Sequence, residues 1–472
     1  PLGPMPRAVP IAPADPFPAP PPPPSLPGTS YPGLPPAVPA PLPAAPALPV
    51  LGQPTPPALI APSDTRAVIA PETIAGAAGY DRGFLIRGAG FSLRVNLLLQ
   101  ARFETFDWDD TAPSPGGDRS GFSLPRAGLR FSGDAPCSMH YLLELDFGNE
   151  GGPLAWDDLN GCIGCTNPNL GPDSQSNEFD PLREAWIEYA PSRALRARFG
   201  LLRTPTTRQL MTRPEQQQFI DISLASAWTG LGMPGYTDRN RDYGVMLHGR
   251  VGADEQIGWM VTVTNGDGGD GIRNVLDRRS SDNLAFGARV NWAFLQPLGY
   301  QEGALRQLTN RWYGEVGVWA FYYADRTDMP HTTEGDYFRG GVDLALGFGP
   351  WSFSGALTWT DDQDVGGVSD DSSTAWLLQV GHHFVDTAFE VAARWSGYDT
   401  EGDLTGDGSA QELAAGVNYY LNGHGNKVQL DLAWIDTDSG GFLILDPYPA
   451  YPAFLGNGDS GLLFRFQWQL AL

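Results

Sequence analysis

The sequence of 472 residues predicts an all-β protein, a sixteen-stranded antiparallel transmembrane β-barrel with an inward-folded third loop and a Pro-rich N-terminal extension. Two observations carry the prediction of a barrel. Apolar and polar residues alternate with a period of two in segment after segment, and short turns alternate with long polar loops between the segments. Both patterns are typical of barrels in the bacterial outer membrane. No run of about 18 apolar residues occurs, so we expect no transmembrane helix.

A Pro/Ala-rich segment precedes the barrel. We assign residues 1–79 to an extended N-terminal segment and residues 80–472 to the barrel domain. Most of the early prolines lie in residues 1–62, a composition that favours polyproline II over a packed core. This segment is either a flexible tail or a spacer in the periplasm that ties the barrel to the cell wall or to an envelope partner. No secretory apolar region is present at the start, so we expect a signal peptide to have been removed.

The first strongly alternating strand lies in FSLRVNLLLQARFETF, residues 91–106. Val95, Leu99 and Phe103 share its apolar face, and Arg94 and Arg102 share its polar face. Because successive side chains of a strand point to opposite faces, one face is expected to meet lipid and the other to line water. The pattern recurs at residues 127–131, 141–147, 185–189, 195–201, 243–247, 257–263, 284–292, 316–322, 338–346, 351–359, 376–384, 389–395, 413–421, 428–434 and 462–472.

The connections separate into two kinds, which predicts short turns at one end of the barrel and long loops at the other. Tryptophan and tyrosine residues near the strand ends fit the aromatic girdles of a membrane barrel. A soluble sandwich also alternates, but two sheets of about eight such strands would be unusually large. The long loops are expected at residues 107–120, 149–181, 204–240, 265–282, 326–335, 362–372, 399–409 and 439–457.

The formal charge of -24 argues against nucleic-acid binding. Lys427 is the only lysine, and the other cations are arginines. This reflects either genomic base composition or the suitability of guanidinium forks for binding anions with two hydrogen bonds. Cysteines are few. Cys162 and Cys165 form a local disulfide or stay free thiols, because zinc would require four ligands.

With the strands placed, the sequence resembles the phosphate-selective porin O and P family of outer-membrane channels. The resemblance covers residues 80–472 and lies in FSLRVNLLLQARFETF, LREAWIEYAPSRALRARFGLLRTP, RNRDYGVMLHGRV and ELAAGVNYYLNGHGNKVQLDLAWI. It implies a homotrimer of sixteen-stranded barrels in which the third loop folds inward and arginines lead anions to a constriction that carries lysine. This sequence has no lysine in residues 204–240, so arginines are the candidates there.

The candidate pore residues are therefore arginines. For any one of them the alternative is a structural role, in which a carboxylate on a neighbouring strand neutralises it. The predicted constriction consists of Arg203, Arg208, Arg213, Arg239 and Arg241. The predicted pore lining consists of Arg94, Arg102, Arg126, Arg130, Arg196, Arg198, Arg250 and Arg289.

We expect an outer-membrane porin that lets small hydrophilic solutes and ions diffuse passively, with a preference for anions such as phosphate. Two other hypotheses stay open: a structural anchor held by the N-terminal segment, and cation selectivity arising from the acidic external loops. Residues 265–271, 362–371 and 401–412 are acidic enough to consider calcium, but a solvated loop is the usual outcome. No catalytic motif, metal site or cofactor site is expected.

Overall fold

The computed structural model describes residues 77–80, 83–109, 119–148, 182–231, 240–252, 254–266, 284–303, 311–327, 334–364, 370–385, 387–401, 408–438 and 460–472. The Pro-rich segment up to residue 76, Arg239, Cys162, Cys165 and much of the three acidic loops lie outside these residues. In the described part of the chain, no helix is long and apolar enough to cross a membrane.

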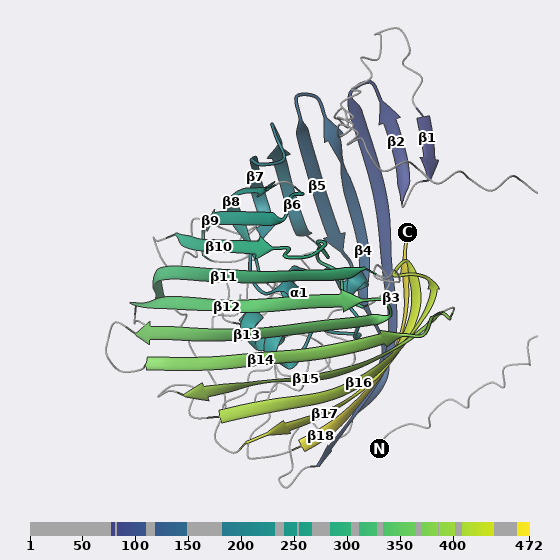
Figure 1. Ribbon diagram of the computed structural model, residues 1–472, viewed down its shortest axis with the longest axis vertical. Helices are drawn as coiled ribbons and strands as arrows, with labels where there is room; N and C mark the ends of the chain where they lie inside the picture. Colours follow the sequence, from purple (N-terminus) through teal and green to yellow (C-terminus); the bar gives the residue numbers. More distant parts are fainter. Residues whose placement is uncertain are drawn as a thin grey trace, which may run out of the picture. The chain divides into compact units, whose positions relative to one another are not determined.

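Within the described residues, sixteen strands form one antiparallel sheet in which each strand pairs with the next along the chain (Figure 1). The last strand returns to the first, with Phe466 opposite Phe103, and this pairing closes the barrel. The predicted strand number and closure are thus confirmed. The strands are β3 (Phe91–Asp109), β4 (Arg119–Ala135), β5 (Met139–Asp146), β6 (Leu182–Tyr189), β7 (Arg196–Arg203), β8 (Arg241–Val251), β9 (Ile257–Thr264), β10 (Ala285–Trp292), β11 (Trp312–Thr327), β12 (Glu334–Phe348), β13 (Trp351–Asp364), β14 (Asp370–His383), β15 (Phe389–Glu401), β16 (Gly408–Asn422), β17 (Asn426–Thr437) and β18 (Ser460–Ala471).

Two short strands precede the barrel. Strands β1 (Ala77–Tyr80) and β2 (Phe84–Gly88) form a hairpin, and β2 pairs with residues 91–95 of β3. This is the end of the barrel at which short turns connect the strands, such as the turn at residues 136–138 between β4 and β5. The chain therefore enters the barrel at its turn end, and strand structure begins slightly before the predicted boundary at residue 80.

The alternation in the sequence becomes two faces of the wall. Outward side chains are large and apolar, and Phe199, Leu413 and Trp468 are 63%, 57% and 56% exposed. Their chain neighbours Glu412 and Gln467 are buried on the inner face. A continuous apolar outer surface of this kind suits hydrocarbon and not water.

The described part of the segment between β7 and β8, residues 204–231, lies inside the barrel, as predicted. It contains α1 (Arg208–Met211), the short 3-10 helix η3 (Pro214–Gln216) and α2 (Leu224–Leu231). Buried backbone N–H groups need acceptors, and here carboxylates on the wall supply them. The amides of Arg208, Ile220 and Leu224 donate to wall carboxylates at 3.0, 3.2 and 3.0 Å. The acceptors are Asp343 on β12, Asp431 on β17 and Glu412 on β16.

Asp221 is the charged anchor of this inward loop. Its carboxylate lies 2.8 Å from Arg102 Nη1, 3.2 Å from Arg465 Nη1 and 3.7 Å from Arg126 Nη2. Burial alone would raise the pKa of Asp221, but the three guanidinium groups outweigh burial and hold this pKa well below its ordinary value. The carboxylate therefore stays ionised and joins the loop to β3, β4 and β18.

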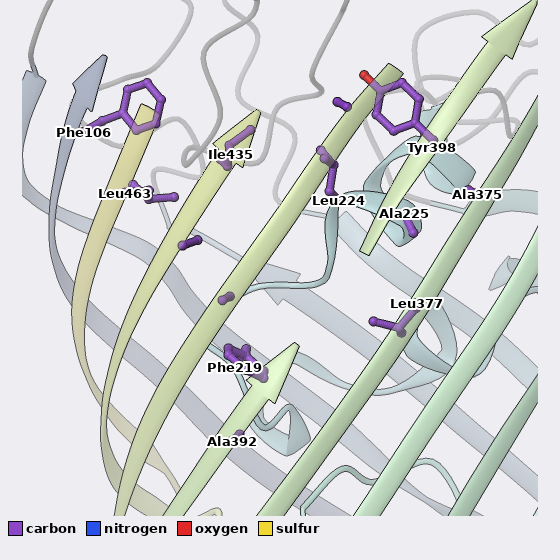
Figure 2. Packing of buried hydrophobic residues seen from close by; sticks show 13 residues of the cluster. Phe106, Phe219, Leu224, Ala225, Ala375, Leu377, Ala392, Tyr398, Ile435 and Leu463 are labelled. Atoms are coloured by element: carbon purple, nitrogen blue, oxygen red, sulfur yellow. The ribbon is translucent and has the colours of Figure 1, made fainter. Parts of the chain in front are cut away.

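An apolar cluster completes the contact between the loop and the wall. Figure 2 shows Phe219, Leu224 and Ala225 of the loop among inward side chains of the wall such as Leu377. Glycine lets the loop come close, since a Cβ at Gly381 on β14 would lie 1.9 Å from Nε2 of Gln218. The alternation in the sequence predicts an inner face that is polar throughout. On β14 to β18 several inward positions instead carry Ala, Leu or Ile, and the loop covers them.

We expect the substitution Asp221→Asn to loosen the inward loop, because three guanidinium groups then lie together without their shared carboxylate. The expected loss is about 3–5 kcal/mol, the range for removing one partner of a buried ion pair. Single-channel recording in planar bilayers measures the effect as more frequent brief closures and greater current noise. Circular dichroism should still report a folded barrel.

The pH dependence of the channel current follows from the lowered pKa of Asp221. Its ion pairs are complete above the ordinary carboxyl pKa of about 4 and weaken only as the pH falls below that value towards the lowered pKa. The wild-type current should therefore stay quiet from neutral pH to about pH 5. The control is Glu255→Gln, a matched change at a turn, where Glu255 pairs with the exposed Arg193. An Asp221→Asn channel as quiet as this control would contradict the anchoring role.

Candidate functional site

In the described part of the chain, a cavity lies on the side of the barrel that the loop does not cover. This cavity of about 950 Å³ is bounded mainly by strands β3 to β8 and by the facing side of the loop. Helix α2 of the loop packs against β14 to β16. The loop is also hydrogen-bonded to Asp343 on β12, Glu412 on β16 and Asp431 on β17. The position of the loop therefore decides which part of the inner wall meets solute.

The lining of this cavity is strongly basic. Alternation places residues two apart on the same face of a strand, so Arg126 and Arg130 both point inward from β4. Arg203 on β7 lies directly opposite Arg241 on β8. Eight arginines line the cavity against three acidic side chains, which leaves an excess of positive charge. The arginines are Arg94, Arg126, Arg130, Arg183, Arg198, Arg203, Arg213 and Arg241, and the acids are Glu144, Asp146 and Glu215.

Two carboxylates just behind the lining hold some of these arginines in place. Glu184 Oε1 lies 3.1 Å from Arg203 Nη2 and 3.5 Å from Arg241 Nε, so one carboxylate serves two guanidinium groups. Glu188 accepts hydrogen bonds from Arg198 Nε and Nη2 at 3.1 and 2.8 Å. The Arg203–Arg241 pair keeps a net positive charge after this partial neutralisation.

The arginines differ in how freely they meet solvent. Arg130 is paired with Glu144 and lies 3.8 Å from Glu215. Arg213 has a side chain that is 41% exposed, and its distance to Glu215 is also 3.8 Å. A contact of this length at an exposed site is weak. Arg213 is therefore the loop arginine in this lining that is best placed to meet a passing ion.

The structure separates the predicted arginines into groups. Of the predicted constriction, Arg203, Arg213 and Arg241 line the cavity, whereas Arg208 donates to the carbonyl of Gly299 and is nearly buried. Arg239 lies outside the described residues. Of the predicted lining, four residues line the cavity, namely Arg94, Arg126, Arg130 and Arg198.

Four arginines of the predicted lining are placed elsewhere. Arg102 is buried against Asp221, and Arg289 is buried against Asp343 at 2.7 Å. The inward loop covers both, so they hold the loop and do not face open water. Arg196 lies 3.4 Å from Glu188, and Arg250 is at the turn end of β8. Neither is part of the cavity lining.

Sequence reasoning missed Arg183. The strict alternation of β6 would turn this residue towards lipid, on the same face as Ala185 and Ile187. The pairing of β5 with β6 shifts between Glu144 and Leu145, and a shift of this kind re-aims the side chains next to it. No signal in the sequence marks such a bulge.

Lys427 does not supply the lysine that the family resemblance implies at the constriction. It is fully buried on β17, and its Nζ donates to the carbonyl of Gln217 at 2.6 Å. It therefore holds the inward loop. Among the described residues, no group of His, Cys, Asp or Glu could hold a metal ion, and Cys137 is an exposed free thiol.

Comparisons with known proteins agree with this fold. The family model of the phosphate-selective porins O and P matches residues 93–441. The anion-selective porin from Comamonas acidovorans is similar in structure, with a TM-score of 0.57 and 15% identity over 81% of this chain and 100% of that chain. OmpF of Salmonella typhi in complex with daunomycin has a TM-score of 0.50 and 12% identity over 84% and 100%.

No curated protein matches this sequence. The two solved structures support the barrel fold at low sequence identity, and the family model extends over well more than half of the chain. The fold, the inward loop and the water-facing inner wall are those of an outer-membrane channel. The chain belongs to the phosphate-selective porin O and P family.

Proposed function

We propose that this porin prefers small hydrophilic anions, phosphate among them, and that they diffuse passively through the cavity between the inward loop and strands β3 to β8. One observation carries the proposal: eight arginines line this cavity against three acidic side chains, and Glu184, Glu188 and Asp221 behind the lining reduce this excess without cancelling it. Guanidinium groups stay protonated at all relevant pH values and bind carboxylate or phosphate oxygens with two parallel hydrogen bonds. A row of such groups in a narrow space between protein walls attracts anions and repels cations.

The pairing of arginines with carboxylates on the wall that the loop covers supports this proposed anion path. Where the loop covers the barrel, arginines are paired within the protein and contribute little net field. The pairs are Arg289 with Asp343, Arg394 with Glu412, and Arg465 with Asp431. The net charge of -24 counts every acidic residue of the chain. Charges on the outer loops are screened over about 8 Å at physiological salt, so the nearer arginines dominate inside the cavity.

We also propose that the protein forms a homotrimer through the outer face of β3 to β8. Tryptophan residues with exposed rings belong to β10, β11, β13, β15, β17 and β18, and the described part of β3 to β9 contributes none. Tryptophan rings of this kind mark the lipid interface, so a wall whose described part has no exposed tryptophan suits contact with another subunit. The exposed tryptophans are Trp292, Trp312, Trp351, Trp359, Trp395, Trp434 and Trp468.

The N-terminal segment is proposed to lie in the periplasm. The hairpin of β1 and β2 pairs with the turn end of β3, and short turns face the periplasm in barrels of this type. From there a Pro-rich segment could reach the cell wall or an envelope partner, since polyproline II extends about 3.1 Å per residue. The barrel would then act as an anchor in addition to a channel.

For anion preference the decisive variant is Arg213→Gln, which removes an exposed positive charge from the cavity. We expect the anion-to-cation permeability ratio to fall roughly twofold, the factor that corresponds to about 0.4 kcal/mol. The reversal potential of the channel in a KCl gradient measures this ratio.

Arg193→Gln serves as the matched control, because Arg193 has an 80% exposed side chain at a turn and pairs with Glu255 outside the cavity. Its reversal potential should equal that of the wild type. Cation preference in the wild type, or equal shifts in the two variants, would contradict the proposed path.

Deletion of residues 1–62 tests the N-terminal segment separately from the pore. We expect single-channel conductance to stay unchanged, because the cavity is built from residues of the barrel and its inward loop. If the segment is a tether, the barrel should separate from cell-wall fragments after detergent extraction, whereas the full chain sediments with them. Equal sedimentation of both forms would argue for a flexible tail.

A further inference from the structure

The arginine-lined cavity also has an apolar side. On β4 the inward positions run Arg126, Gly128 and Arg130, so a glycine lies between two guanidinium side chains. Leu98 on β3 is the direct cross-strand neighbour of Gly128 and also lines the cavity. Basic and apolar surface therefore alternate along this part of the wall.

A second apolar area follows on the next strands. Leu142 on β5 pairs with Trp186 on β6, and both line the cavity. The guanidinium of Arg198 lies 3.8 Å from the centre of the Trp186 ring. The loop side contributes Leu210 and Ile222, which belong to one buried apolar cluster. Leu142, Leu210 and Ile222 are only 6%, 7% and 2% exposed, so the partly exposed Leu98 and Trp186 supply most of the apolar surface that a solute can meet.

Gly128 forms a shallow recess between the two arginines. A Cβ at this position would meet the carbonyl oxygen of Leu145 at 3.5 Å and the Cβ of Leu98 at 3.6 Å, which are ordinary contact distances. Along a strand, residues two apart are separated by about 6.6 Å, so Arg126 and Arg130 are about 13 Å apart along β4. A ring or short hydrocarbon chain fits between them while its charged end reaches one guanidinium.

Hydrated inorganic anions gain nothing from such a surface. Chloride and phosphate have no apolar atoms to bury, and their hydration shells are costly to place against Leu98 and Trp186. An organic anion gains both the charge contact with arginine and the burial of its hydrocarbon part. The combination of groups in this cavity therefore favours anions that carry an apolar body.

We infer that the cavity binds small organic monocarboxylates of benzoate type in preference to inorganic phosphate. The inference rests on the proposed function, because the cavity must lie on the path of anions. It adds the chemical class of the preferred solute, because the apolar wall gives no advantage to an inorganic anion.

The test uses the purified full-length channel in planar bilayers. Chloride current is recorded while sodium benzoate or sodium phosphate is added at equal ionic strength. We expect benzoate to reduce the current at a half-blocking concentration at least tenfold below that of phosphate. Benzyl alcohol, which has the same ring without the carboxylate, should not block at these concentrations, since the arginines require a charge.

Two variants locate the effect. Leu98→Asn keeps a similar side-chain volume and removes the apolar surface, and it should raise the half-blocking concentration of benzoate at least fivefold without changing that of phosphate. Gly128→Ala fills part of the recess at ordinary contact distances and should weaken benzoate block in the same direction. Either variant alone suffices if the other fails to fold.

The outcomes separate this inference from the proposed function. If the wild type prefers anions in a KCl gradient but benzoate and phosphate block equally, the benzoate site is refuted and the anion path stands. If both variants keep the wild-type response to benzoate, the apolar wall is not its binding surface. Cation preference of the wild type would overturn the proposed path itself.

Discussion

The structure of this porin depends on how a loop satisfies its backbone inside a barrel. Its buried amides cannot reach water, so wall carboxylates must accept their hydrogen bonds. Asp343, Asp431 and Glu412 do so. Asp221 of the loop in turn forms ion pairs with Arg102 and Arg465 of the wall. Together these contacts hold the loop against one side of the barrel and leave the other side open.

This one-sided attachment gives arginine two roles in the same channel. Beneath the loop, Arg102 and Arg289 are buried in ion pairs and act as structural cross-links. On the open wall, guanidinium groups outnumber the carboxylates, and Arg213 is exposed to the cavity. A fully paired charge contributes little field beyond its partner, whereas an excess charge acts on passing ions. Selectivity therefore depends on which arginines the loop covers, more than on their total number.

The same attachment shapes the apolar part of the channel. Phe219, Leu224 and Ala225 take up inward apolar positions of β14 to β18, so most of the apolar inner wall is closed to solute. Leu98 and Trp186 on β3 and β6 are not covered in this way and line the cavity beside arginines. A porin with a strictly polar lumen would have neither the apolar cluster under the loop nor the mixed wall opposite it.

The sequence by itself determined the barrel and the strand number, and its resemblance to a porin family implied the inward third loop. Period-two alternation depends only on local strand geometry, and the lengths of the connections distinguish the turn end of the barrel from the loop end. Only the tertiary structure decided which inward arginines are accessible. The alternation along the strands shows that Arg102 and Arg130 both point inward, but the loop covers Arg102 and leaves Arg130 at the cavity. Arg183 reached the cavity through a register shift, and Lys427 was buried by a loop residue more than two hundred positions away. These outcomes depend on contacts between distant segments, which no local pattern encodes.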